Sequence, residues 1–126
     1  NNAGGNVAII AVGSMVEETY KAIDMLEKEN VHPAFVNPVF IKPMDTELIK
    51  RVAENHKHII VVEEGIKKGG FGESVETFIL ESGIDADVQV MAIDDRFVEQ
   101  GNVALLREEI GISYKNIYEK VMELTR

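Results

Sequence analysis

The sequence contains no cysteine, only three prolines, and far fewer basic than acidic residues. Without cysteine the chain cannot form disulfides, thiolate nucleophiles or cysteine-based metal sites. Its 13 lysines and arginines stand against 22 acidic residues, which leaves a formal net charge of -9. Nucleic acids and anionic membranes are bound by clustered basic residues, and none is visible here. We therefore expect neither a nucleic acid nor a membrane as a partner.

Long hydrophobic runs are also missing. No run approaches the roughly 20 apolar residues that span a bilayer, and no signal-peptide pattern precedes the first apolar run, so we expect a cytoplasmic protein. The 126 residues, 45% of them hydrophobic and 28% charged, suit one domain with a real core. Residues 1–5 show no periodicity and are expected to be disordered or to derive from an expression tag, which leaves residues 6–126 as the domain.

Four short apolar runs predict β-strands at residues 7–13, 32–37, 58–64 and 87–93. Each run is nearly continuous rather than alternating, which is typical of strands that are covered on both faces. Such strands occur in parallel sheets, where each crossover connection places a helix over one face. These runs therefore predict the centre of an α/β domain.

Helical periodicity fills the intervals between the runs. A capping box of Ser14 and Glu17 predicts a helix directly after the first strand, and Gly83 is placed to end the third helix. Further helices are predicted at residues 44–55, 72–83, 103–111 and 114–126. The expected inner faces are Val16, Tyr20, Ile23 and Leu26, then Leu48, Ile49 and Val52, then Val75, Phe78 and Ile79, and finally Tyr114, Ile117, Val121 and Leu124. This alternation of strand and helix predicts a three-layer α/β/α domain with a parallel sheet.

The glycine-rich stretch after the third strand could belong to either of two structures. Gly69, Gly70 and Gly72 precede a predicted helix, so their N–H groups could bind an anion. The spacing matches neither common phosphate-binding motif, however, and Lys67 and Lys68 precede the glycines instead of following them. A tight turn, with the phenylalanine between these glycines packed against a neighbour, is the favoured interpretation, and anion binding remains the alternative.

Acidic residues stand at two predicted strand ends. Glu63 and Glu64 are adjacent in a strand, so their side chains point to opposite faces and cannot form one catalytic pair. Asp95 and Arg96 can form a local ion pair, with Phe97 adding apolar surface. Glu63 or Glu64 could reach across a subunit interface or cap the following turn. We interpret both sets as contacts at an interface in preference to catalytic groups.

The histidines do not predict a metal centre. His56 and His58 lie two residues apart across a helix-to-strand junction, and no third ligand is in reach. No nucleophile or histidine accompanies the acids either. We therefore expect no catalytic, cofactor-binding or metal-ligating residue in this chain.

Four segments, in their order and spacing, resemble the C-terminal domain of the 1-deoxy-D-xylulose-5-phosphate synthases, which are thiamine-diphosphate-dependent enzymes of the transketolase type. These segments are AVGSMVEE, FVNPVFIKPMD, VVEEGIKKGGFGES and IDDRFVEQG. The E-E-x(5)-G-G-x-G element is shared more widely, including with β subunits of 2-oxoacid dehydrogenases, whereas the F-x-K-P-x-D and D-R-F-x-E-x-G elements point to the synthases. The retained positions are Phe40, Lys42, Pro43, Asp45, Asp95, Arg96, Phe97, Glu99 and Gly101, while Gln100 and Gly65 stand where the family often has histidine and asparagine.

The resemblance implies an activity for the complete enzyme and a supporting role for this chain. The enzyme would condense pyruvate with D-glyceraldehyde 3-phosphate, with loss of CO2, to make a precursor of isoprenoids, thiamine and pyridoxal. Thiamine diphosphate and Mg2+ would be held by two other domains of a homodimeric enzyme. Alone, this chain is expected to bind no cofactor, to be inactive, and to support dimer and interdomain packing. The expected interface residues are Glu63, Glu64, Gly69, Gly70, Phe71, Gly72, Asp95, Arg96 and Phe97.

The resemblance also implies a strand order of 2-1-3-4. In the family an antiparallel strand lies beside the second strand, and we expect it to fall outside this chain, so that residues 32–37 form an exposed sheet edge.

Two other hypotheses remain open. The chain could be the C-terminal domain of a 2-oxoacid dehydrogenase β subunit that docks an acyltransferase, and residues upstream of Asn1 would decide between the two enzymes. It could also be a free-standing flavodoxin-like module that binds a phosphate or nucleotide, which an anion bound at the N–H groups of Gly70 to Gly72 would support.

Overall fold

The computed structural model describes most of the chain, and everything below refers to that part. The described residues are 5–13, 15–37, 46–64, 70–93 and 114–125. The helix predicted at residues 103–111 therefore lies outside them. None of the described helices is long and apolar enough to cross a bilayer.

The described residues alternate between strand and helix, as predicted. In chain order the elements are β1 (Val7–Ala11), α1 (Met15–Lys28), β2 (Ala34–Val36), α2 (Thr46–Asn55), β3 (His58–Glu64), α3 (Phe71–Glu81), β4 (Asp87–Ile93) and α5 (Tyr114–Thr125). The strands form one parallel sheet in the order β2-β1-β3-β4, which confirms the predicted order. The chain reverses its direction of travel across the sheet between β1 and β3, and this is the switch point at which ligands bind in folds of this kind.

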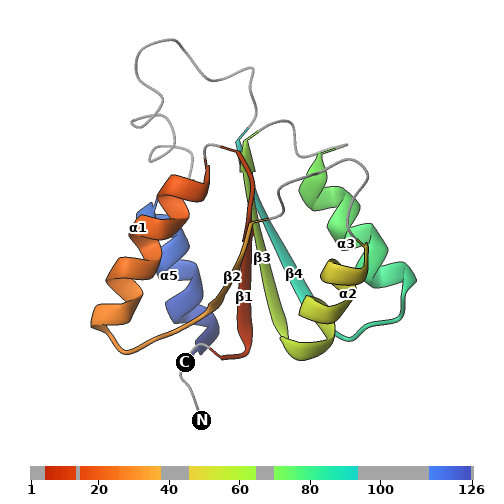
Figure 1. Cartoon of the computed structure of the whole chain (residues 1–126), viewed down its shortest axis with the longest axis horizontal. Coiled ribbons are helices and arrows are strands. Elements are labelled where there is room, and N and C mark those ends of the chain that lie inside the picture. Colours follow the sequence, from red (N-terminus) through yellow and green to blue (C-terminus); the bar gives the residue numbers. More distant parts are fainter. Residues whose placement is uncertain (1–4, 14, 38–45, 65–69, 94–113, 126) are drawn as a thin grey trace.

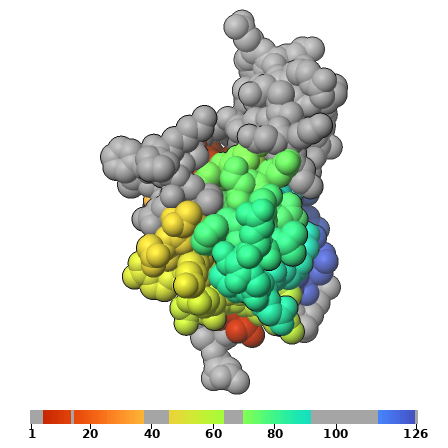
Figure 2. Space-filling view, turned by 90° about the vertical axis from the view of Figure 1, so that its right-hand side faces the viewer, coloured from red at the N-terminus to blue at the C-terminus, as the bar shows by residue number. Residues whose placement is uncertain are grey.

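The helices cover the sheet on both faces, which confirms the three-layer prediction. Helices α1 and α5 lie on one face, and α2 and α3 lie on the other (Figure 1). Figure 2 shows α2 and α3 side by side on the second face. Strand β2 is at one end of the sheet and β4 at the other, so the short β2 segment is an edge, as expected.

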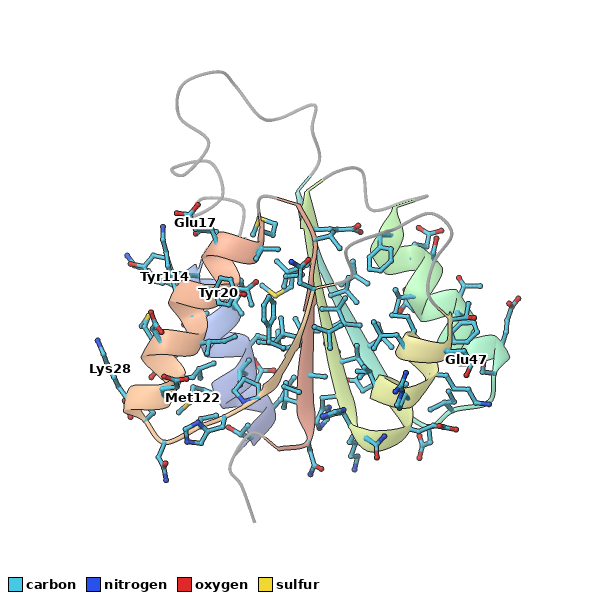
Figure 3. The ribbon with its side chains drawn as sticks, in the orientation of Figure 1. Glu17, Tyr20, Lys28, Glu47, Tyr114 and Met122 are labelled. Carbon is cyan, nitrogen blue, oxygen red and sulfur yellow. The ribbon has the colours of Figure 1, made fainter. Side chains whose placement is uncertain are left out.

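The inner face of α1 differs from the predicted one. Leu26 is fully buried as expected, but Tyr20 is 54% exposed, so its assignment to the inner face was wrong. Its ring instead packs edge-to-face on Phe35 of β2, with 5.0 Å between ring centroids. The buried residues of α1 are Met15, Glu18, Thr19, Ala22 and Leu26, while Glu17 and Lys28 point away from the sheet (Figure 3). Thr19 and Ala22 are fully buried on this face, together with the larger Met15 and Leu26.

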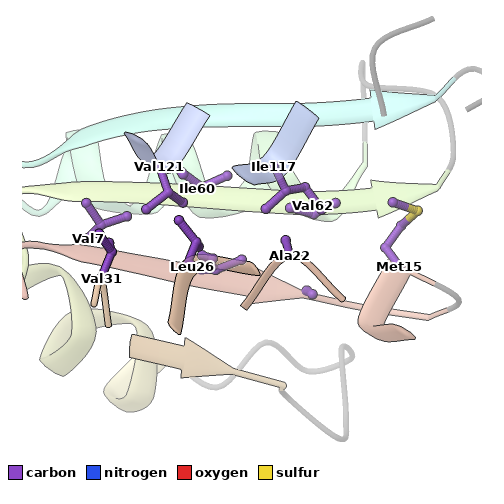
Figure 4. Close-up of a cluster of buried hydrophobic side chains, with 11 residues drawn as sticks. Val7, Met15, Ala22, Leu26, Val31, Ile60, Val62, Ile117 and Val121 are labelled. Atoms are coloured by element: carbon purple, nitrogen blue, oxygen red, sulfur yellow. The ribbon is translucent and has the colours of Figure 1, made fainter. Parts of the chain in front are cut away.

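The two central strands carry the core. All five residues of β1 are fully buried, and successive side chains point to opposite faces of the sheet. Val7 and Ile9 join a cluster with Leu26, Ile60 and Ile117 between the sheet, α1 and α5 (Figure 4). A second cluster on the other face contains Ala8, Ile10, Ile49, Ile59, Val75 and Ile79.

Two helices end in the same capping arrangement. After α3, Gly83 has a φ of +72°, the N–H of Gly83 donates to the carbonyl of Leu80, and the N–H of Ile84 donates to Ile79. This is a Schellman motif, and it confirms the predicted role of Gly83. After α1, Asn30 takes the same left-handed position with a φ of 60°.

Replacing Leu26 by alanine tests the first cluster. Leu26 is fully buried, so Leu26→Ala should lower the free energy of unfolding by about 2–5 kcal/mol, measured by urea denaturation. The matched control is Leu80→Ala, which makes the same change at a side chain that is 78% exposed. It should change the stability by no more than about 0.5 kcal/mol. Equal losses from both variants would contradict the described packing.

Candidate functional site at the carboxyl end of the sheet

The candidate site lies where the parallel strands end and their helices begin. In this fold class, ligands bind at the carboxyl ends of the strands beside the switch point. Strand β3 ends at Glu64, α3 begins at Phe71, and α1 begins at Met15 soon after β1. Glu63, Gly70 and Gly72, which were singled out in the sequence, therefore fall at this end of the sheet.

Glu63 is buried at the carboxyl end of β3 and caps the start of α3. Its side chain is 3% exposed, and its Oε1 accepts a hydrogen bond of 2.9 Å from the N–H of Gly72. The residue before the helix, Gly70, has no side chain that could cap the free N–H groups. A carboxylate from the preceding strand therefore does the work of a capping side chain.

Two opposing effects act on this carboxyl group. Burial raises the pKa of Glu63 above its ordinary value of 4.5, because the charged form loses its hydration. Hydrogen bonds from the backbone N–H groups of Gly72 and Phe71 lower it, because they stabilise the charged form. Burial is the larger effect, so the pKa of Glu63 is raised on balance.

Gly72 is needed for space. A Cβ atom at this position would lie 2.5 Å from Cγ1 of Val90 and 2.9 Å from Oε1 of Glu63. The glycine thus lets the first turn of α3 lie directly against β3 and β4. Phe71 beside it is 8% exposed and belongs to the cluster on the α2 and α3 face, which confirms the prediction that it packs inward.

A second buried carboxylate was missed in the sequence. Glu18 of α1 is 8% exposed, and its Oε1 accepts a hydrogen bond of 3.2 Å from the N–H of Tyr114, the first residue of α5. Its Oε2 lies 3.2 Å from Nζ of Lys21. A usable signal was present, because Glu18 falls on the same helical face as Met15 and Ala22.

The remaining predicted interface residues are only partly described. Gly70 has an extended backbone, with φ -85° and ψ 179°, that does not require glycine. The backbone of Glu64 pairs with β4 opposite Ile93. Gly69, Asp95, Arg96 and Phe97 lie outside the described residues. Their assignment to an interface therefore stays a prediction.

The histidines do not come together at a metal site. Nδ1 of His56 lies 2.8 Å from the carbonyl oxygen of Val52, and Nδ1 of His58 lies 3.4 Å from Oδ2 of Asp87. In the described part of the chain, no three or more histidine, aspartate or glutamate side chains are grouped to hold a metal ion.

Carboxylates of the same chain occupy the starts of two helices. The starts of α3 and α5 attract negative charge, and each receives a carboxylate from another element of the same chain. The Gly72 N–H is therefore already engaged and is not available to an external phosphate, which removes one donor from the anion-binding alternative.

Comparisons with known proteins match nearly the whole chain to one domain family. The family model described as "Transketolase, C-terminal domain" matches residues 1–117. A 1-deoxy-D-xylulose-5-phosphate synthase of Dehalococcoides mccartyi (strain ATCC BAA-2266 / KCTC 15142 / 195) is 40% identical over 124 residues, which cover 97% of this chain and 19% of the relative. The enzyme of the same name from Alkaliphilus oremlandii is 38% identical over 120 residues, with 95% and 19% covered.

A solved structure is also similar. It is described as "Split gene transketolase, inactive beta4 tetramer", and it matches with a TM-score of 0.82 at 27% identity, covering 98% of this chain and 41% of that one. The chain spans about a fifth of the length of the curated relatives, at 19% of each of the two named above.

The raised pKa of Glu63 predicts a pH-dependent stability. Its protonated form is favoured in the folded state, so its contribution is fully present below pH 4.5 and is lost as the pH rises through the raised folded-state pKa. Relative to Glu63→Gln, which keeps an accepting oxygen but cannot ionise, the wild type should lose stability as the pH rises above 4.5 and through the raised folded-state pKa. Glu47→Gln removes the same charge from an exposed position of α2 as a control. A wild type that gains stability relative to Glu63→Gln as the pH rises would contradict the prediction.

The close contact at Gly72 predicts a steric penalty. Gly72→Ala should lower the free energy of unfolding by about 1–3 kcal/mol, because its Cβ collides with Val90. In a Val90→Ala background the same change should cost less, since the colliding Cγ atoms are gone. Urea denaturation of the four proteins in this cycle measures the coupling. Equal costs in both backgrounds would exclude the contact.

Proposed function

The chain belongs to the family of transketolase C-terminal domains, and on this premise we propose that it is the C-terminal domain of a 1-deoxy-D-xylulose-5-phosphate synthase. The observation that carries the proposal is the match to curated synthases along nearly the whole chain, at 31–40% identity. The complete enzyme would join pyruvate to D-glyceraldehyde 3-phosphate with loss of CO2, and would act as a homodimer in the cytoplasm.

The domain itself is proposed to be non-catalytic. The use of its buried acids supports this, because Glu63 and Glu18 each accept a backbone N–H at a helix start. Carboxylates that accept these hydrogen bonds stabilise the fold and are poorly placed to transfer a proton to or from a substrate. The described residues also include no cluster suited to Mg2+, so thiamine diphosphate and Mg2+ are assigned to the remainder of the enzyme.

The proposed contact surface is the carboxyl end of the sheet. Gly70 is half-buried and Phe71 lies at the start of α3, directly beside the turn held by Glu63. Glu63 would act there by fixing the turn from inside, since its own side chain is buried. The other residues assigned to this surface are Glu64, Gly69, Gly72, Asp95, Arg96 and Phe97.

Cofactor binding and turnover test the proposal. Calorimetry with thiamine diphosphate and Mg2+ should show no binding to the 126-residue chain, and pyruvate with D-glyceraldehyde 3-phosphate should give no product. The full-length protein should bind the cofactor and form 1-deoxy-D-xylulose 5-phosphate under the same conditions. Cofactor binding by the 126-residue chain would refute the non-catalytic role. A full-length protein that oxidises a 2-oxoacid with an acyltransferase partner, and does not use the aldehyde, would favour the dehydrogenase alternative.

A further inference from the structure

A groove of about 510 Å3 lies beside α3, apart from the carboxyl end of the sheet. One wall is the face of α3 that carries Glu76 and Leu80, and the other is the turn and the beginning of β4, from Ile84 to Val88. Figure 2 shows α3 and the segment that leads into β4 next to each other on this face. The volume lies within the range of about 300–1,000 Å3 found for ligand sites.

The groove presents apolar side chains to solvent. Leu80 is 78% exposed, which is unusual for a large apolar side chain in the described part of this domain. Ile84 and Val88 are half-buried beside it and also line the groove. An apolar strip flanked by polar side chains is typical of a binding surface.

Strand β4 forms the edge of the sheet next to this groove. It pairs with β3 on one side, and within the described residues no strand pairs with its outer side. An open strand edge offers backbone N–H and C=O groups to an extended peptide, which can be added as a further strand. The groove would then receive one of the side chains of that peptide.

The charge around the groove selects the kind of peptide. Glu73, Glu76 and Asp87 line it, and no lysine or arginine is among the described lining residues. The carboxylate of Asp87 lies at the beginning of β4. It accepts hydrogen bonds from the side-chain amide of Gln89 and lies 3.4 Å from Nδ1 of His58. A second copy of the chain would bring the same net charge of -9, so complementarity disfavours self-association here.

We propose that this groove binds an extended basic segment of a separate protein. The segment would add to the outer edge of β4, insert an apolar side chain beside Leu80 and Ile84, and place lysine or arginine next to Glu76 and Asp87. The choice of a separate protein rests on the proposed function, in which the carboxyl end of the sheet contacts the rest of the enzyme. The groove lies at the opposite end of β4, where the strand begins at Asp87.

A fluorescent peptide that repeats valine-threonine-lysine-threonine is the probe, because valine and lysine then share one face of the added strand. Its anisotropy with the 126-residue chain measures the affinity. Glu76→Lys should weaken binding by about three- to tenfold, because it replaces an attraction at the groove with a repulsion. The matched control is Glu27→Lys, which reverses one exposed charge on α1, and it should leave the affinity within about twofold. Leu80→Ala should weaken binding by about three- to tenfold through lost apolar contact.

Two outcomes would overturn the groove as the binding site. The first is equal weakening by Glu76→Lys and Glu27→Lys, which would mean attraction to the net charge alone. The second is equal binding of a peptide that repeats valine-threonine-glutamate-threonine. The peptide should also shift the amide NMR signals of α3 and β4 and spare those of α1.

The full-length protein separates this inference from the proposed function. Its peptide affinity should match that of the 126-residue chain, whereas a groove that no longer binds would show that the same polypeptide covers it and would overturn the separate partner. Synthase activity in the same sample reports on the proposed function independently. An inactive protein that still binds the peptide would count against the function and not against the groove.

Discussion

The hydrogen bond between the buried carboxylate of Glu63 and the N–H of Gly72 joins the start of α3 to the end of β3. A helix that begins directly against a sheet has free N–H groups and little room for side chains. Glycine at position 72 supplies the room, because a Cβ there would collide with Val90, and Glu63 supplies the acceptor. The burial that makes this contact possible also raises the pKa of Glu63. The packing and capping at the start of α3 and the ionisation of Glu63 therefore depend on one another.

The same solution occurs on the other face of the sheet. Glu18 of α1 accepts the N–H of Tyr114 at the start of α5, from 96 residues away in the sequence. Both helices thus begin at carboxylates that come from elsewhere in the chain. Because the positive ends of helices are the usual anion sites of this fold class, these two carboxylates occupy places that a substrate phosphate could otherwise take.

The sequence was sufficient to predict the strands and their order, because β1 and β3 are continuous apolar runs and the motifs resemble a known family. It was less informative about which helix face is buried. Tyr20 counts as apolar in a periodic pattern, yet it packs at the sheet edge on Phe35 while the smaller Thr19 is fully buried. Thr19 can be buried because its Oγ1 donates to the carbonyl of Met15. The partners of Glu18 and Glu63 are tertiary contacts, and no local spacing rule reveals them.

The glycine element combines acids with glycines and therefore looks like catalytic machinery, but the described contacts give Glu63, Phe71 and Gly72 a structural role. The first glutamate is an internal helix cap, the phenylalanine fills the core, and the last glycine makes space for two strands. None of these tasks depends on which substrate the enzyme uses. An element with these structural tasks is compatible with enzymes that catalyse different reactions.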